Sequence, residues 1–220
     1  GANTFTTSSK NTTGAGFVAV VVASYAAGSA VLSDVYGNTY ASVTARSATN
    51  EKVQIFYHLS PTVGASHTWT LTGTGIYANI FVQYFSVAGG TPAYDSNESG
   101  NNSSADVTSL ACSSATTPSV NDALIIAGVI NGVNSSAPIL AGGITQTASE
   151  FAVSSQYYGG AGGYAIQTTA AAITASASWS TGAPAAITQA AFRIGGGGGS
   201  STTPPRSITR SFASTRSSNY

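Results

Sequence analysis

Short apolar runs recur about every 10 residues along this chain, each bounded by Gly, Asn, Ser or Pro. Valine, isoleucine and aromatic residues dominate the apolar positions. No stretch keeps the apolar periodicity and the end caps of an α-helix. Spacing and residue types of this kind are typical of a β-sandwich or barrel, so the sequence predicts an all-β fold.

The expected strands form two sets. The first set lies at 17–25, 38–46, 52–59, 66–72 and 77–87. The second set lies at 107–112, 123–130, 144–150, 153–158, 163–168, 173–180 and 185–194. In the first set, His67, Trp69 and Leu71 alternate with hydroxyl residues and share one face, which predicts that the tryptophan fills the core.

The two sets resemble each other. The segment VQIFYHLSPTVGASHTWT (53–70) aligns without a gap with GYAIQTTAAAITASASWS (163–180) and pairs Trp69 with Trp179. We expect an antiparallel two-layer sandwich of jelly-roll or immunoglobulin-like type, from a duplication of two five-stranded halves. Chance similarity between β-rich segments is the alternative. The expected organisation is an N-terminal arm (1–14), a sandwich (15–195) with pseudo-repeats at about 17–90 and 122–195, a Gly/Ser/Pro linker (196–205) and a basic tail (206–220).

Charged residues make up only 6% of the chain, so its surface consists of hydroxyl, amide and glycine groups. Such a surface is common on extracellular and virion proteins. The net charge of zero gives no reason to expect nucleic acid as a partner. The longest apolar run, 15–28, is too short to span a bilayer and is interpreted as a buried strand rather than a membrane insertion or a signal segment.

Catalytic and metal-binding motifs are missing. The two histidines, His58 and His67, lie in expected strands, and neither HExxH, CxxC nor GxSxG spacing occurs. We interpret both histidines as scaffold residues and predict no enzyme. The glycine-rich segment 159–166 lacks the spacing of a nucleotide loop and is interpreted as a hairpin tip or a bulge.

One segment has the oxygen spacing of a calcium loop. In DSNESGNNSSAD, Asp95, Asn97 and Ser99 stand at positions 1, 3 and 5, and Asp106 stands at position 12. Position 8 is polar, no helices are expected on either side, and Asp106 is shorter than the usual glutamate. The alternative is a polar crossover between the halves, rich in turn-forming residues.

Beyond five consecutive glycines, the C-terminal tail regains a strand-like pattern. Arg206, Ile208, Arg210 and Phe212 would share one face of an extended chain. The tail carries three arginines and no acid, whereas residues 1–195 carry four basic and seven acidic side chains. We expect the tail to add a strand to a sheet, either on a neighbouring subunit or on its own sandwich; a poorly held tail is the third possibility.

The segments FVAVVVASY, DVYGNTYASVT, VQIFYHLSPTVGASHTWTLTGTG, IFVQYFSV and NDALIIAGVI resemble Ser/Thr/Gly-rich immunoglobulin-like or jelly-roll modules. Such modules occur in phage virion proteins (tail, fibre and capsid decoration) and in bacterial secreted proteins. The resemblance covers about 15–195 and implies a structural or adhesive role, with no active residues. We therefore expect a structural subunit of a virion or an extracellular assembly, most readily a phage virion protein, that binds other copies of itself or other subunits.

The alternative is a carbohydrate-binding or adhesion module. Tyr157, Tyr158 and Tyr164 flank the glycine-rich segment and would stack on a cell-surface glycan.

Overall fold

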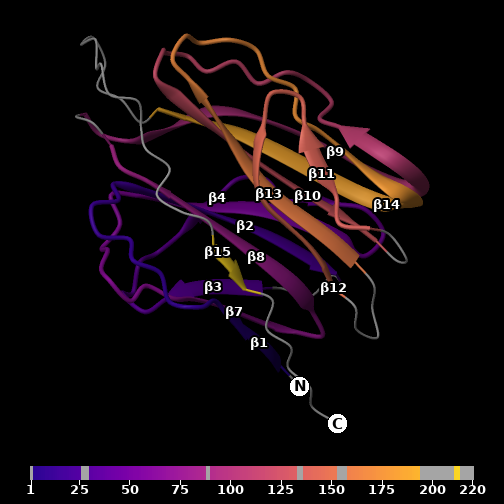
Figure 1. The fold of residues 1–220 in the computed structure, drawn as a ribbon, viewed down its shortest axis with the longest axis horizontal. Coiled ribbons are helices and arrows are strands. Elements are labelled where there is room, and N and C mark those ends of the chain that lie inside the picture. Colours follow the sequence, from indigo (N-terminus) through magenta and orange to yellow (C-terminus); the bar gives the residue numbers. More distant parts are fainter. Residues whose placement is uncertain are drawn as a thin grey trace.

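The computed structural model describes residues 2–25, 30–87, 90–132, 136–152, 158–193 and 211–213. Within these ranges every regular element is a β-strand, and the strands pair antiparallel in two six-stranded sheets and one three-stranded sheet (Figure 1). The predicted all-β sandwich is therefore confirmed. No helix in the described part of the chain is long and apolar enough to cross a membrane.

The first main sheet is built around β2, which pairs along its whole length with β6 on one side and β8 on the other. Its order is β15-β8-β2-β6-β4, and β5 also pairs with β6. Its strands are β2 (Phe17–Tyr25), β4 (Ala41–Ser42), β5 (Arg46–Ser47), β6 (Glu51–Leu59), β8 (Tyr77–Phe85) and β15 (Ser211–Ala213).

The second main sheet is built in the same way around β10, which lies between β13 and β14. Its order is β11-β14-β10-β13-β12, and β9 also pairs with β14. Its strands are β9 (Ala93–Ala111), β10 (Ala123–Asn131), β11 (Ile139–Ala141), β12 (Thr145–Ala152), β13 (Tyr158–Gln167) and β14 (Ser176–Arg193).

A small third sheet covers the outer face of the first main sheet. It contains β1 (Ala2–Thr6), β7 (Trp69–Thr74) and β3 (Ala30–Asp34), with β7 in the middle. Phe5 is buried in the same cluster as Trp69 and Leu71. The N-terminal segment, expected to be an arm, is thus part of the body.

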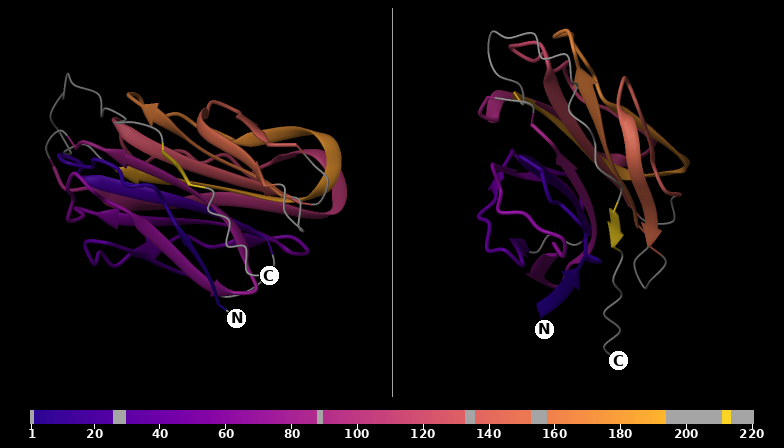
Figure 2. Two further views of the ribbon diagram at one scale, coloured as in Figure 1. Left: turned by 60° about the horizontal axis from the view of Figure 1, so that its bottom comes forward. Right: turned by 60° about the vertical axis from the view of Figure 1, so that its left-hand side comes forward.

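The main core lies between the two large sheets. It joins apolar side chains of β2, β6 and β8 to those of β10 and β14, and Phe17 contacts Phe192 with ring centroids 4.9 Å apart. The views of Figure 2 show the two layers stacked. Glycines permit the closest approach: a Cβ on Gly162 would lie 2.7 Å from the Cβ of Phe81. The glycine-rich segment is therefore the interior of β13 and not the hairpin tip or bulge that the sequence analysis expected.

The outer faces of both main sheets are covered as well. Val18, Val20 and Val22 of β2 pack beneath the third sheet, and the outward residues of β10 pack beneath the segment that includes Ile173 and Trp179. Every residue of β2 and of β10 is buried for this reason. A strand buried on both faces has a continuous apolar sequence, which explains the two apolar runs.

The two halves share one strand order. In each half, the strand that contains the aligned tryptophan pairs with a short outer strand, β3 or β11. Val35 and Ile139 occupy matching places in the two halves. Val35 donates its backbone N–H to the Thr68 carbonyl at 3.1 Å. Ile139 lies opposite Ser178, which is the residue aligned with Thr68. Val35 and Ile139 are both exposed, at 59% and 63%.

Two expected segments fold differently. Within the expected strand 38–46, only Ala41–Ser42 and Arg46, the first residue of β5, lie in strands. The polar segment 95–106, interpreted as a calcium loop or a crossover, belongs to the long strand β9, which pairs with β14.

Candidate functional site

A buried polar network lies under the third sheet. Asp34 is the last residue of β3 and His67 precedes β7; His67 Nε2 lies 2.8 Å from Asp34 Oδ2, and both side chains are fully buried. The other ring nitrogen, Nδ1, lies 2.9 Å from Thr12 Oγ1. Because an ionised carboxylate can only accept, His67 donates from Nε2 to Asp34.

The Asp34 carboxylate accepts several further hydrogen bonds. The Tyr40 hydroxyl and the Asn38 side-chain amide each donate to Oδ2 at 2.7 Å, and Trp69 Nε1 donates to the Tyr40 oxygen at 2.7 Å. Burial by itself raises the pKa of Asp34, but hydrogen bonds from Asn38, Tyr40 and His67 outweigh it and hold the pKa below its ordinary value. The carboxylate is therefore held charged by the residues around it.

Thr12, His67 and Asp34 repeat the hydroxyl–imidazole–carboxylate order of a hydrolytic triad. Thr12 is fully buried, and its Oγ1 also bonds the backbone N–H and carbonyl of Gly64, each at 3.2 Å. The ring of Tyr36 packs edge-on over His67 with centroids 4.8 Å apart. A hydroxyl in this position cannot meet a substrate, so the network ties the loops to the third sheet.

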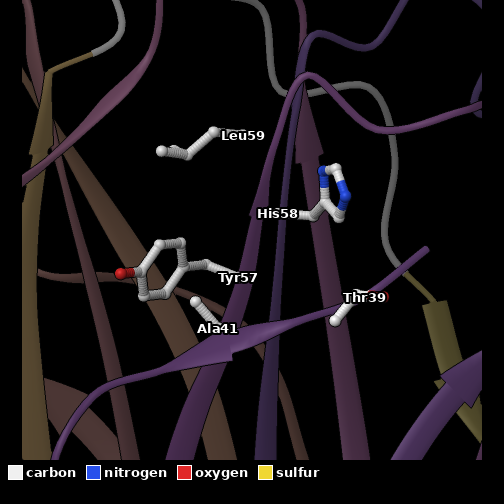
Figure 3. Close-up of a pocket in the computed structure, with 5 residues that line it drawn as sticks. All are labelled: Thr39, Ala41, Tyr57, His58 and Leu59. Carbon is white, nitrogen blue, oxygen red and sulfur yellow. The ribbon is translucent and has the colours of Figure 1, made fainter.

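His58 borders a shallow pocket of about 270 Å³ on the surface of the first main sheet (Figure 3). Tyr57 and His58 leave β6 in opposite directions, and His58 Nδ1 is buried without a hydrogen-bond partner. The lining residues are Thr39, Ala41, Tyr57, His58 and Leu59. They include one imidazole and no carboxylate, so they do not form an acid–base pair.

Glu98 of β9 joins the two main sheets at one margin. Its Oε2 accepts from the Tyr94 hydroxyl at 2.7 Å and from the Thr44 N–H at 3.3 Å, and its Oε1 lies 4.0 Å from Arg46 of β5. Burial by itself raises the pKa of Glu98, but these hydrogen bonds and the charge of Arg46 hold the pKa below its ordinary value. The cluster is half-buried and links β9 to β5 and to the segment before it.

The calcium candidates do not converge. Asp95 accepts hydrogen bonds from the backbone and the hydroxyl of Ser119, and Asp106 is exposed farther along β9. At a rise of about 3.3 Å per residue, these two carboxylates lie on the order of 30 Å apart. The other two candidates also have partners in the chain: Asn97 donates to the Thr117 carbonyl, and Ser99 contacts the Ser114 hydroxyl at 3.0 Å. In the described ranges, no three His, Cys, Asp or Glu side chains gather as a metal site would require.

The structure describes two of the three candidate glycan-binding tyrosines, and neither ring is exposed on the surface. Tyr158 is buried in the main core, where its ring stacks on Tyr25 with centroids 6.2 Å apart. Tyr164 is half-buried and packs edge-on to Phe85 at 5.2 Å. Tyr157 lies outside the described residues. The described rings therefore form no exposed platform for a sugar.

The tail reaches the edge of β8 within the same chain, on the side away from β2. β15 pairs antiparallel with β8 in the register Ser211 to Val82, Phe212 to Phe81 and Ala213 to Ile80. Figure 2 shows this short yellow strand at the margin of the first sheet. The other residues expected on the docking face, Arg206, Ile208 and Arg210, lie outside the described residues.

Two amides on the inner face of β8 distinguish this edge from an ordinary apolar strand. With its side-chain amide turned so that the oxygen faces the Gly163 N–H, Gln83 pairs with the Gly163 backbone, oxygen to N–H at 3.1 Å and nitrogen to carbonyl at 3.3 Å. Asn79 is only 1% exposed, and neither its Oδ1 nor its Nδ2 has a hydrogen-bond partner. An unpaired buried amide is unfavourable, and it lies one residue beyond the end of the pairing with β15.

Sequence reasoning missed both amides. The signal was present, since Asn79 and Gln83 interrupt the apolar run YANIFVQYF. Polar residues in a strand buried on both faces require partners, and this requirement marks them for inspection.

Comparisons with family models, with curated proteins and with solved structures each found no match for this chain.

Proposed function

We propose that this chain is a non-catalytic structural subunit of a virion or an extracellular assembly, most readily of a phage virion, and that it docks through its C-terminal tail. The observation that carries the proposal is the pairing of β15 with the β8 edge. A tail segment that follows a glycine-rich linker takes the role of a strand in a sheet. Strand addition of this kind is a common way to join protein subunits.

The chemistry of the described side chains supports the same proposal. The side chains of Thr12, His67 and Asp34 are buried and hydrogen-bonded to one another, to neighbouring side chains or to backbone. The clusters around Glu98 and Asp95 hold strands and loops together. These groups stabilise the fold rather than face a substrate. A surface of hydroxyls and amides with few charges suits a protein packed among copies of itself.

The experiment compares three forms of the protein by sedimentation velocity and negative-stain microscopy over a range of concentrations. They are the full chain, a chain that lacks 200–220, and a chain in which 206–216 is replaced by Gly and Ser at equal length. All residues of the three core clusters lie between Phe5 and Phe192, so the shortened chain keeps its cores. Only the full chain is expected to assemble. Equal assembly of all three forms would contradict docking through the tail.

A further inference from the structure

The connection between the body and β15 is longer than the contact within one chain requires. β14 ends at Arg193 and β15 begins at Ser211, with residues 194–210 between them. Because β14 packs over β6, the end of β14 and the start of β15 are separated by three strand spacings, one sheet spacing and a few residues along β8, a direct distance of about 20 Å. A connection of this length can span up to about 56 Å. The tail therefore has the length to reach a neighbouring copy.

The pairing within one chain is also short. Only three residue pairs join β15 to β8, and each backbone hydrogen bond adds little net stability because water competes for the same groups. A tethered strand has an effective concentration of about millimolar, which favours pairing within the chain in dilute solution. When copies are packed side by side, the tail of a neighbouring copy has a similar effective concentration at the β8 edge and competes with the chain's own tail for it.

The edge of β8 (Tyr77–Phe85) continues beyond the three residues that pair with β15. The second main sheet extends past β13 to β12, while the first sheet ends at β8 apart from β15. Gly160 and Gly162 of β13 pack directly against Phe81, since a Cβ on Gly160 would lie 3.1 Å from that ring and a Cβ on Gly162 would lie 2.7 Å from its Cβ. The unpaired Asn79 amide lies just beyond the Ile80–Ala213 pair. A strand that pairs one residue further along β8 would lie opposite Asn79.

We propose that the β8 edge accepts the tail strand of a second copy of this chain, which pairs antiparallel with β8 in the register Ser211 to Val82 and extends by at least one residue to bind the Asn79 amide. This inference rests on the proposed function and names the acceptor site for the tail. Copies that exchange tails in this way are joined without any new fold, because the same strand pairing is only moved between chains.

Disulfide trapping between two full-length variants tests the proposal. One carries Ser211→Cys and the other carries Val82→Cys, so no single chain holds both halves of the trap. Opposite residues in antiparallel strands have Cα atoms about 4.5–5.5 Å apart, within the range of a disulfide. The matched control replaces Val82→Cys by Val20→Cys, because Val20 is the β2 partner of Val82 and lies in the same buried cluster, away from β15.

We expect the Ser211→Cys and Val82→Cys chains to form a mixed disulfide dimer under assembling conditions, at least 10-fold above the Val20→Cys control. A chain that carries both Ser211→Cys and Val82→Cys checks the pairing within one copy. If that chain closes an internal disulfide while the mixture gives no dimer, the exchange between copies is overturned. That result leaves docking of the tail on another partner intact, whereas assembly of the tail-less chain overturns the proposed function itself.

Asn79→Val tests the role of the amide. We expect this variant to unfold at a higher denaturant concentration than the wild type, because an unpaired buried amide is removed. We also expect its yield of mixed dimer to fall at least threefold, a loss that a purely structural role would not cause. An unchanged yield would remove Asn79 from the acceptor site.

Discussion

Trp69 and Trp179 seal the outer faces of the two main sheets from aligned strand positions, yet their indole N–H groups donate to unrelated acceptors. Trp69 Nε1 donates to the Tyr40 hydroxyl at 2.7 Å and so joins the Asp34 network. Trp179 Nε1 donates to the Val107 carbonyl at 2.7 Å. The two halves thus share their strand order and differ in the hydrogen bond that the tryptophan makes on the outer face of each main sheet.

This difference predicts unequal costs for the two tryptophans. Trp69 is fully buried and Trp179 is 6% exposed. We expect Trp69→Phe to lower the free energy of unfolding by about 2–4 kcal/mol and Trp179→Phe by about 1–2 kcal/mol, since each leaves an acceptor unpaired but only Trp69 supports a buried network. Urea unfolding of both variants measures this. A larger loss of unfolding free energy for Trp179→Phe than for Trp69→Phe would contradict the larger stabilising role given to Trp69.

Acid should weaken the fold through two carboxylates. The pKa of Asp34 and of Glu98 is lower in the folded chain than in the unfolded chain, so folding favours the charged forms. Their contribution is complete above the unfolded values of 3.8 and 4.5 and is lost as the pH falls through the folded values. We expect the free energy of unfolding to be nearly flat from pH 7 to about pH 5 and to fall below it.

The variant Asp34→Asn checks the assignment of this acid sensitivity. At pH 7 we expect it to lose about 1–3 kcal/mol, because donors from His67 and Tyr40 then face an amide. The gap between variant and wild type should narrow as the pH is lowered toward 3. A constant gap across that range would show that the Asp34 charge is not the cause.

Gly128 of β10 lies in close contact with β2 across the main core. A Cβ at this position would overlap Cγ1 of Val21 on β2. We expect Gly128→Ala to cost about 1–3 kcal/mol, and we expect the loss to be partly recovered in the double variant with Val21→Ala. Denaturant unfolding of the two single variants and the double variant measures the coupling. Strictly additive losses would contradict the contact.

Cys112 should be inert in the folded protein. It is 5% exposed, and burial raises the pKa of its thiol to about 12, although the charge of Arg46 acts in the opposite direction. A thiol reagent at pH 8 is expected to label Cys112 at least 100-fold more slowly in buffer than in 6 M guanidinium chloride, as an order-of-magnitude estimate. Fast labelling of the native chain would show that the outer layer of the second half opens readily.

The sequence predicted best where one physical requirement decides the pattern. The runs 17–25 and 123–130 are continuous and apolar because layers cover both faces of β2 and β10. The alternation around Trp69 placed that ring in the core correctly, and both tryptophans are buried.

The prediction failed where contacts between distant segments override local preference. Asn38 and Tyr40 turn toward Asp34, so residues 37–40 form no strand although their pattern alternates. The turn-forming residues of 95–106 lie in β9 because β14 provides an edge to pair with. The glycines before Tyr164 are strand residues because Phe81 approaches them across the core, a contact that no local pattern reveals.

Backbone hydrogen exchange along β8 tests the docking edge most directly. The full chain is compared with the double variant Ser211→Pro and Ala213→Pro, which cannot form β15, and with Ser201→Pro as a control in the linker. We expect the amides of residues 80–82 that point away from β2 to be protected in the wild type and in the control, and to exchange freely in the double variant. Identical exchange in all three proteins would contradict a tail strand on β8 and, with it, the proposed mode of assembly.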